Sequence, residues 1–239
     1  MRSLSLVAAL TLVGCSNTSD AAEPVGPRTT RTFAVSDFSA VALRGSDDVD
    51  GRVGTGFSVR AEGPVAELDK LEIVRVGDTL RIGRKKNLAG FSWGGGQRGV
   101  KVFVTMPRIV AAQIAGSGDL AIDRVEGQRF GGESAGSGNL SIATLSVSEA
   151  RLSVGGSGDI AAKGRVERLT INLAGSGNVA AGGLTARSAT VSLAGSGDVR
   201  AEVAGPARVA LTGSGDVDLG RQARCTISKA GSGDVRCGG

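Results

Sequence analysis

Apolar and polar residues alternate through the second half of the chain, and the alternation restarts about every 20 residues. After each Gly-Ser-Gly-Asp or Gly-Ser-Gly-Asn motif the order is apolar, polar, apolar, as in Leu120 to Ile122. A mirrored pair such as Leu152 and Val154 precedes the next motif. Alternation with a period of two is typical of β-strands that bury one face. The pattern therefore predicts short strands joined by sharp corners at the glycines.

The motif recurs through residues 114–239 at a nearly constant spacing of 18 to 20 residues. A fixed period near this length is typical of a solenoid in which each coil packs on its neighbours. Strands that rise about 3.3 Å per residue can close a coil of that length. We therefore predict an all-β, single-domain parallel β-helix, or β-solenoid. A Gly/Ser-rich low-complexity tract would lack the flanking Val, Leu and Ile at a fixed phase.

Glycine is expected at each corner because the backbone turns there in a conformation that other residues disfavour, and because stacked corners leave little room for Cβ atoms. The Asp or Asn that closes each motif is predicted to accept a bond from a nearby backbone N–H in a turn. A cation held between stacked carboxylates is the less favoured alternative, with Asp198, Asp216 and Asp234 as its weak candidates. No cofactor is expected. The predicted corner residues are Gly116, Asp119, Gly136, Asn139, Gly156, Asp159, Gly175, Asn178, Gly195, Asp198, Gly213, Asp216, Gly231 and Asp234.

Residues 32–113 lack the regular motif and are predicted to form an N-terminal β-rich cap together with the first coils, continuous with the solenoid. Gly45 to Val49 looks like a degenerate first copy of the repeat. A short helix is predicted from Pro64 to Lys70, with Pro at its first position. A hairpin that turns at Gly77 and Asp78 follows it, and a strand runs from Val100 to Met106. Such a cap would cover the open end of the solenoid.

The N-terminus contains a targeting segment. An apolar run from Leu4 to Val13 is too short to span a bilayer. The Leu-Val-Gly-Cys that ends at Cys15 resembles the lipobox of bacterial lipoproteins. Residues 1–14 are therefore predicted to be a signal peptide and Cys15 a lipid attachment site, with ordinary secretion and an accidental thiol as the alternative. Residues 15–31 lack apolar periodicity and are expected to be a flexible tether.

Composition narrows the function classes. Histidine is absent, which excludes Ser-His-Asp triads and imidazole metal sites. The formal net charge of +5 comes with no nucleic-acid motif, so no nucleic-acid partner is expected. The coils carry almost no insertions that could wall a catalytic groove, so we predict no catalytic residues.

One basic cluster with aromatic residues lies between the predicted hairpin and the strand that ends at Met106. It is a candidate contact for a sugar or an anionic membrane surface. In the alternative, Trp93 packs onto the end of the solenoid. The residues of this cluster are Arg84, Lys85, Lys86, Phe91, Trp93 and Arg98.

Two cysteines remain if Cys15 is acylated. Cys225 and Cys237 are 12 residues apart, and the phase of the repeat points both of them inward in the final coils. An exported protein can oxidise such a pair, so a disulfide is predicted there. The alternative is two buried thiols that lie too far apart, because a bridge needs Cα atoms within about 7 Å.

Several segments in a fixed order resemble the head GIN domain family, bacterial envelope proteins labelled as auto-transporter adhesins and without an assigned activity. The resemblance covers about residues 33–239 and implies a β-helical fold and an envelope location. It supplies no catalytic residues, and the adhesin label is itself an analogy. The matching segments are Asp37-Phe38-Ser39-Ala40-Val41, Gly77-Asp78-Thr79-Leu80-Arg81-Ile82, Val100-Lys101-Val102-Phe103-Val104-Thr105-Met106-Pro107 and the Gly-Ser-Gly-Asp/Asn run.

These observations predict a non-enzymatic, lipid-anchored envelope protein that acts as a binding, adhesion or structural module. Ser16 after the lipobox cysteine, in place of Asp, favours the outer membrane. The membrane is the expected partner through the lipid, and an envelope polysaccharide or protein is a further candidate. The alternative is a carbohydrate-active β-helix enzyme that acts on an envelope or extracellular polysaccharide.

The lipobox leads to a direct test. We expect the Cys15→Ala protein to lose acyl labelling and to leave the membrane fraction, because the thiol that carries the lipid is gone. Metabolic labelling with a fatty acid and fractionation of the cells measure both effects. Labelling that survives the substitution would contradict the lipobox interpretation.

Overall fold

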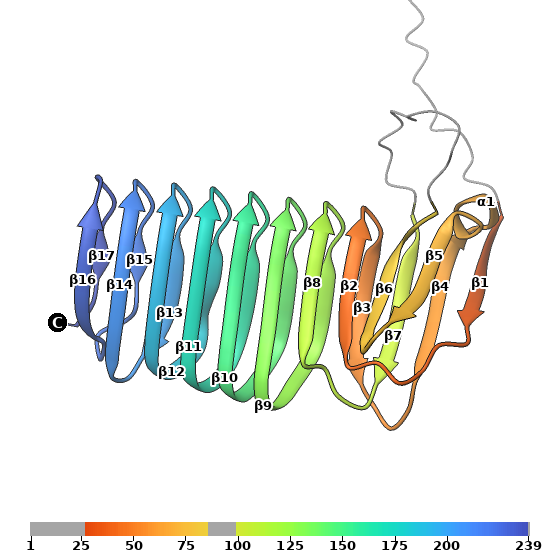
Figure 1. Cartoon of the computed structure of the whole chain (residues 1–239), viewed down its shortest axis with the longest axis horizontal. Coiled ribbons are helices and arrows are strands. Elements are labelled where there is room, and N and C mark those ends of the chain that lie inside the picture. The colour runs from red at the N-terminus through yellow and green to blue at the C-terminus, as the bar shows by residue number, and fades with distance from the viewer. Residues whose placement is uncertain (1–26, 86–98, 239) are drawn as a thin grey trace, which may run out of the picture.

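The repeat builds a row of stacked coils, and parallel pairing joins each coil to the next (Figure 1). This arrangement confirms the predicted all-β solenoid. The computed structural model describes residues 27–85 and 99–238. In four coils one long strand runs from a Gly-Ser-Gly corner, around a bend at the opposite edge, and back to the next corner. These strands are β9 (Leu120–Gly136), β10 (Leu140–Gly156), β11 (Ile160–Gly175) and β12 (Val179–Gly195).

The last coils are divided into shorter strands, in the same parallel register. Ala189 pairs with Ala207, and Ala207 pairs with Cys225, so the columns of side chains continue to the C-terminal end. These strands are β13 (Val199–Val203), β14 (Pro206–Gly213), β15 (Val217–Asp218), β16 (Arg224–Ala230) and β17 (Val235–Arg236).

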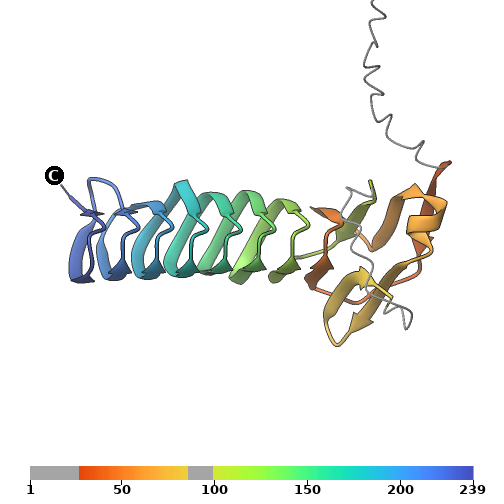
Figure 2. The same cartoon turned by 90° about the horizontal axis from the view of Figure 1, so that it is seen from above.

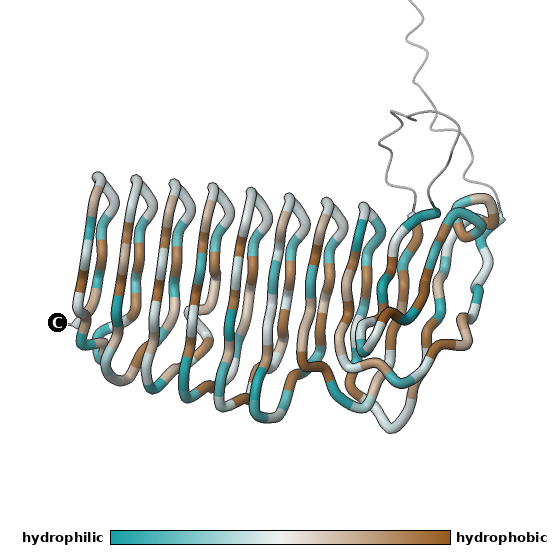
Figure 3. The backbone as a smooth tube through the Cα atoms, in the orientation of Figure 1, coloured by the Kyte–Doolittle hydropathy of each residue, from teal (hydrophilic) through white to brown (hydrophobic). Residues whose placement is uncertain are grey.

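Stacking places equivalent apolar residues on top of one another inside the coils. Leu120, Leu140 and Ile160 form one such column, and all three are fully buried. Hydrophobic positions recur at the same height in successive coils (Figure 3). Full burial of a Leu or Ile contributes roughly 1.5 to 3 kcal/mol. The interior therefore has one apolar layer per coil, built mainly of Leu, Ile, Val and Ala, with Phe130 as a buried aromatic residue on β9.

At the N-terminal end the coils do not stack in the order of the sequence. β2 (Ala40–Gly45) and β3 (Asp48–Val53) form one coil, which lies between the coil of β8 (Ala111–Gly116) with β9 and the coil of β6 (Thr79–Arg84) with β7 (Lys101–Met106). The chain thus forms the inner coil of β2 and β3 first and then the outermost coil of β6 and β7. It then passes the inner coil again and starts the regular repeat at β8.

The corner of this inner coil is the degenerate copy of the motif. Gly45 aligns with Gly116, and the N–H of Ser117 donates to the carbonyl of Gly45 at 2.9 Å, as equivalent residues do in the later coils.

An antiparallel cap covers the outermost coil (Figure 2). It consists of β1 (Arg28–Phe33), β4 (Ser58–Pro64), α1 (Val65–Leu68) and β5 (Leu71–Val76). The expectation of a tether through residue 31 is wrong for its last residues, because β1 begins at Arg28. β1 pairs with β4 over its whole length, and Arg31 donates to the Leu68 carbonyl at 2.9 Å.

The corner glycines meet two separate demands. Gly175 has φ of +137°, in the region that other residues disfavour, whereas Gly177 does not need such a backbone. A Cβ atom at either position would collide with a carbonyl oxygen of the preceding corner, that of Gly156 or Gly158. The second glycine of the motif is therefore required by the close approach of successive corners alone.

The C-terminal end is closed differently. A disulfide joins Cys225 to Cys237, with Cα atoms 6.1 Å apart, and links the two arms of the last coil. Lys229 occupies a column that in preceding coils contains Leu193 and Leu211, and its ammonium donates to the Gly233 carbonyl at 2.7 Å. A charged side chain thus replaces an apolar one in the column at the last coil.

The crowded corner predicts a sharp contrast between two glycines. We expect Gly177→Ala to lower the free energy of unfolding by about 3 kcal/mol, because its Cβ would strike the Gly158 carbonyl. Gly155→Ala is the matched control, since no atom lies within 4 Å of its added Cβ and its backbone is ordinary. Chemical denaturation measures both variants. Equal small effects would show that the corners tolerate a side chain.

The disulfide predicts how the exported protein reacts with thiol reagents. Alkylation of the denatured, non-reduced protein should leave Cys225 and Cys237 unmodified in a mass spectrum, and prior reduction should expose both. Loss of the bridge should destabilise the folded protein by about 2 to 3 kcal/mol, because the 12-residue loop gains entropy when unfolded. Two alkylated cysteines without reduction would mean that packing alone holds this end.

Candidate functional site

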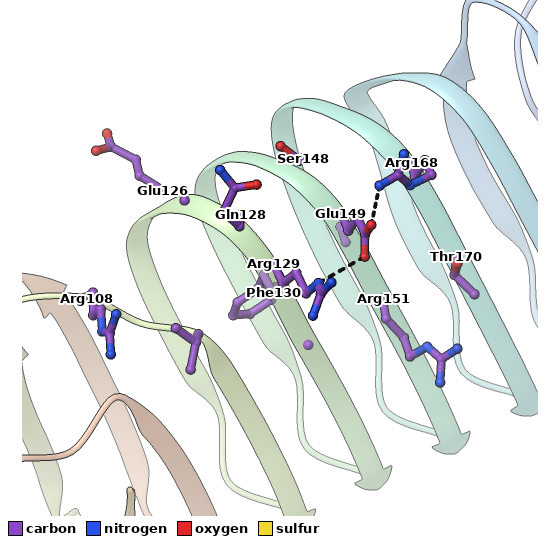
Figure 4. Close-up of a pocket in the computed structure, with 14 residues that line it drawn as sticks. Arg108, Glu126, Gln128, Arg129, Phe130, Ser148, Glu149, Arg151, Arg168 and Thr170 are labelled. Carbon is purple, nitrogen blue, oxygen red and sulfur yellow. Dashed lines mark hydrogen bonds and ion pairs between the residues drawn. The ribbon is translucent and has the colours of Figure 1, made fainter.

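A groove lies on the edge of the solenoid opposite the Gly-Ser-Gly corners, where the coils bend (Figure 4). It has a volume of about 1270 Å³ and crosses successive coils, from the loop before β8 to β11. Its charged and aromatic lining residues are Arg108, Glu126, Arg129, Phe130, Glu149, Arg151 and Arg168. We call this feature the arginine groove.

The hollow exists because one position in a column has no side chain. Ala111, Gly131, Arg151 and Thr170 share a register on β8 to β11, and a Cβ atom added at Gly131 would meet nothing within 4 Å. The N–H of Gly131 donates to the Val110 carbonyl at 3.1 Å, which holds the loop that carries Arg108 against β9. Open backbone therefore forms part of the wall of the groove.

An ion-pair ladder crosses the groove. Arg129, Glu149 and Arg168 occupy the same register on β9, β10 and β11. Nε of Arg129 lies 3.3 Å from one carboxylate oxygen of Glu149, and Arg168 bonds the other oxygen. The hydrogen bond from Arg168, reinforced by its charge, lowers the pKa of Glu149. The ladder thus keeps the Glu149 carboxylate ionised and places a guanidinium group on either side of its negative charge.

Two further arginines of the groove have no such partner. Within residues 27–85 and 99–238, neither Arg108 nor Arg151 forms an ion pair or donates a side-chain hydrogen bond. Both guanidinium groups are free to bind an external anion.

This arrangement suits binding better than hydrolysis. A glycosidase needs a pair of carboxyl groups, one of which has a raised pKa so that it can protonate the leaving group. The groove is lined by two carboxylates, Glu126 and Glu149, and the pKa of Glu149 is lowered. The shift is therefore opposite to the one that acid catalysis requires.

Arg84 is not available as the ligand contact that the sequence suggested. Its Nε donates to Asp47 at 2.9 Å, and a second nitrogen bonds Glu67. Its side chain is 19% exposed and that of Asp47 is 3% exposed. Burial disfavours the charge on Arg84, but Asp47 and Glu67 outweigh it and raise its pKa. The cluster joins the inner coil to β6 and α1, so its role is structural.

The rest of the basic cluster is only partly described. Lys85 is exposed, and its amine donates to the Asp69 carbonyl at 2.8 Å. Lys86, Phe91, Trp93 and Arg98 lie outside the described residues, as does Cys15. Their suggested contacts with a ligand, a membrane or a lipid remain predictions.

The Asp/Asn column forms a ladder between coils. The N–H of Asn139 donates to Asp119 at 2.9 Å, and the N–H of Asp159 donates to Asn139 at 3.0 Å, with the same pattern through to Asp234. Each side-chain oxygen thus accepts a hydrogen bond from the backbone of the next coil. The predicted turn would instead have formed this bond within one coil. Parallel stacking places the next N–H within reach.

The cation alternative gains no support from this geometry. Among the described residues, no group of three His, Cys, Asp or Glu side chains is arranged to hold a metal ion, and this includes Asp198, Asp216 and Asp234. Each of the last two donates its backbone N–H to the carboxylate before it.

Sequence reasoning missed the arginine groove, although a signal was present. Arg129, Glu149 and Arg168 are 20 and 19 residues apart, which is the period of the corner motif. Residues at that spacing must lie above one another on neighbouring coils. A search for charged columns in phase with the corners would have found the ladder.

Comparison with protein families gives one assignment. Residues 37–223 match the family described as "Putative auto-transporter adhesin, head GIN domain". The chain belongs to this family. Among curated proteins, none matches it. In the described part of the chain, no helix is long and apolar enough to cross a bilayer.

Solved structures agree on the fold. A "putative adhesin" from Bacteroides fragilis has a TM-score of 0.82 at 21% identity, over 90% of this chain and 98% of its own. A "putative lipid binding protein" from Parabacteroides distasonis has a TM-score of 0.67 at 22% identity, over 89% and 97%. A "putative adhesin" from Parabacteroides merdae has a TM-score of 0.63 at 14% identity, over 89% of this chain and 96% of its own. At these identities the likeness shows the shared solenoid and nothing of the ligand.

Proposed function

We propose that this head GIN domain protein is a non-enzymatic binding module of the bacterial cell envelope, anchored by lipid at Cys15 in the outer membrane. Its rigid solenoid presents the arginine groove to an envelope or extracellular partner. The observation that carries the proposal is the groove itself, which combines free guanidinium groups with a carboxylate whose pKa is lowered. The adhesin names within the family and among the similar structures support a binding role in the envelope.

A lipid at Cys15 suits this arrangement. The first described strand of the cap begins at Arg28, so the predicted anchor joins the end of the molecule that carries the cap. The repeat coils extend from the cap in one row, and the groove begins at the loop before β8, beside the coils that join cap and repeat. In the anchored protein the groove would thus lie at a fixed position relative to the cap.

Binding to the envelope tests this function. The soluble Cys15→Ala protein, labelled with a fluorophore, should bind envelope fractions of the producing cells in a saturable way and leave their polysaccharides intact. A pull-down identifies the bound material, and an assay for new reducing ends measures cleavage. Absence of saturable binding would contradict the proposal. Cleavage that depends on the protein would favour the carbohydrate-active enzyme.

A further inference from the structure

We propose that the arginine groove binds a linear polysaccharide whose repeats carry carboxylates, laid across the stacked coils from Arg108 to Arg168. The inference rests on the proposed binding function and gives it a ligand class.

The two arginines of the groove that form no ion pair indicate which charged group the ligand carries. Arg108 and Arg151 form no ion pair with any described residue, and both line the groove. The planar fork of a guanidinium matches the two oxygens of a carboxylate and donates two parallel hydrogen bonds to it. Guanidinium–carboxylate pairing already occurs inside the groove, where Arg129 and Arg168 each contact one oxygen of the Glu149 carboxylate. A sugar carboxylate would repeat this pairing at the two unoccupied guanidinium groups.

The charge density of the groove favours a sparsely charged polymer. Four arginines face two glutamates, Glu126 and Glu149, so the excess of positive charge is small. Double-stranded DNA carries one charge per roughly 1.7 Å, far more than this groove can neutralise. Single-stranded nucleic acid would require exposed aromatic rings for stacking, whereas Phe130 is 3% exposed. A polysaccharide with no more than one carboxylate per sugar ring fits this excess better than a nucleic acid does.

The spacing of the free arginines fits an extended repeating ligand. Ala111 on β8, Gly131 on β9 and Arg151 on β10 share one column. Neighbouring strands are about 4.8 Å apart, which places the backbones of Ala111 and Arg151 roughly 10 Å apart along the solenoid. Arg108 precedes Ala111 by three residues, on the loop that comes from β7 and lies beside Ser39 of the preceding coil. A ligand that reaches both guanidinium groups must therefore extend over at least two sugar rings, with carboxylates on different rings.

The floor of the groove suits a sugar ring. Gly131 offers open backbone in the column between Ala111 and Arg151, and Figure 4 shows Gln128, Ser148 and Thr170 around the same hollow. Hydroxyl and amide groups can exchange hydrogen bonds with sugar hydroxyls. The missing side chain thus provides the room, and the polar rim provides partners for the uncharged parts of a saccharide.

Binding to polymers of known charge tests the inference on the soluble Cys15→Ala protein. We expect saturable binding to polygalacturonate that weakens as salt is raised. Polygalacturonate with its carboxylates methyl-esterified keeps the sugar and loses the charge, so it should bind at least about tenfold more weakly. Alginate and hyaluronan are two further carboxylated polymers. Dextran sulfate and single-stranded DNA report on general affinity for polyanions.

Three variants locate the binding. The double variant Arg108→Gln with Arg151→Gln should bind polygalacturonate at least about tenfold more weakly, because it removes both free guanidinium groups. Gly131→Ile fills the hollow and should weaken binding to a similar extent while the protein stays folded, since no atom lies near the added Cβ. Arg208→Gln is the matched control. It removes an exposed arginine from the same column three coils beyond Arg151, outside the groove, and should leave binding unchanged.

The outcomes separate this inference from the function on which it rests. Binding to none of the three carboxylated polymers, or equal loss in Arg208→Gln and in the double variant, would overturn it. Tighter binding to dextran sulfate or DNA than to polygalacturonate would overturn the carboxylate preference. If the protein binds envelope fractions but polygalacturonate does not compete, the binding function stands and the ligand class is wrong. If it binds no envelope material, the proposed function fails, whatever the polymers show.

Discussion

The distance between stacked corners is the constraint on which this protein depends. A carbonyl oxygen of one corner lies close to the position that a Cβ atom of the next corner would occupy. The carbonyl oxygen of Gly158, for example, would collide with a Cβ atom added at Gly177. Each corner from Gly116 onward, which stacks on the corner before it, must therefore keep glycine at both glycine positions of its motif. The bend edge is less restricted. Gly164 and Gly205 approach a carbonyl of the preceding coil there, but Gly127 and Gly131 have open space around them. Varied and charged side chains can therefore gather on that edge, and the arginine groove forms there without disturbing the stack.

The repeat made most of the fold predictable. A fixed period, inward alternation and corner glycines are local properties, and each of them specifies the same stacked coil. The order of the first coils was not predictable in this way. Residues 40–53 pair with β6 and β7 on one side and with β8 and β9 on the other, and partners so distant in sequence leave no periodic signal. The start of the cap at Arg28 has the same origin, because it depends on pairing with β4.

The functional residues were harder to predict than the fold, for a physical reason that two positions illustrate. Arg84 stands in a basic run and looks accessible, but the inner coil brings Asp47 beside it. Asp47 occupies the place of the second corner glycine, in the degenerate corner on which the Gly116 corner stacks; among the described residues no Gly-Ser-Gly corner precedes it. Gly131 is hard to predict for a different reason, because it contributes to the groove by having no side chain. Sequence patterns report side chains that are present, and a hollow appears only when neighbouring coils are in place.

Lys229 places a charge in an otherwise apolar column at the last described coil. A solenoid of identical coils has no intrinsic end, and the unpaired edge of its last strand could pair with another chain and extend into a fibre. In this protein the column of leucines ends in an ammonium group that donates to the Gly233 carbonyl. A further coil stacked on β16 would have to bury that charge against apolar side chains, which is costly without a counter-ion. The lysine thereby disfavours the stacking of a second chain on β16.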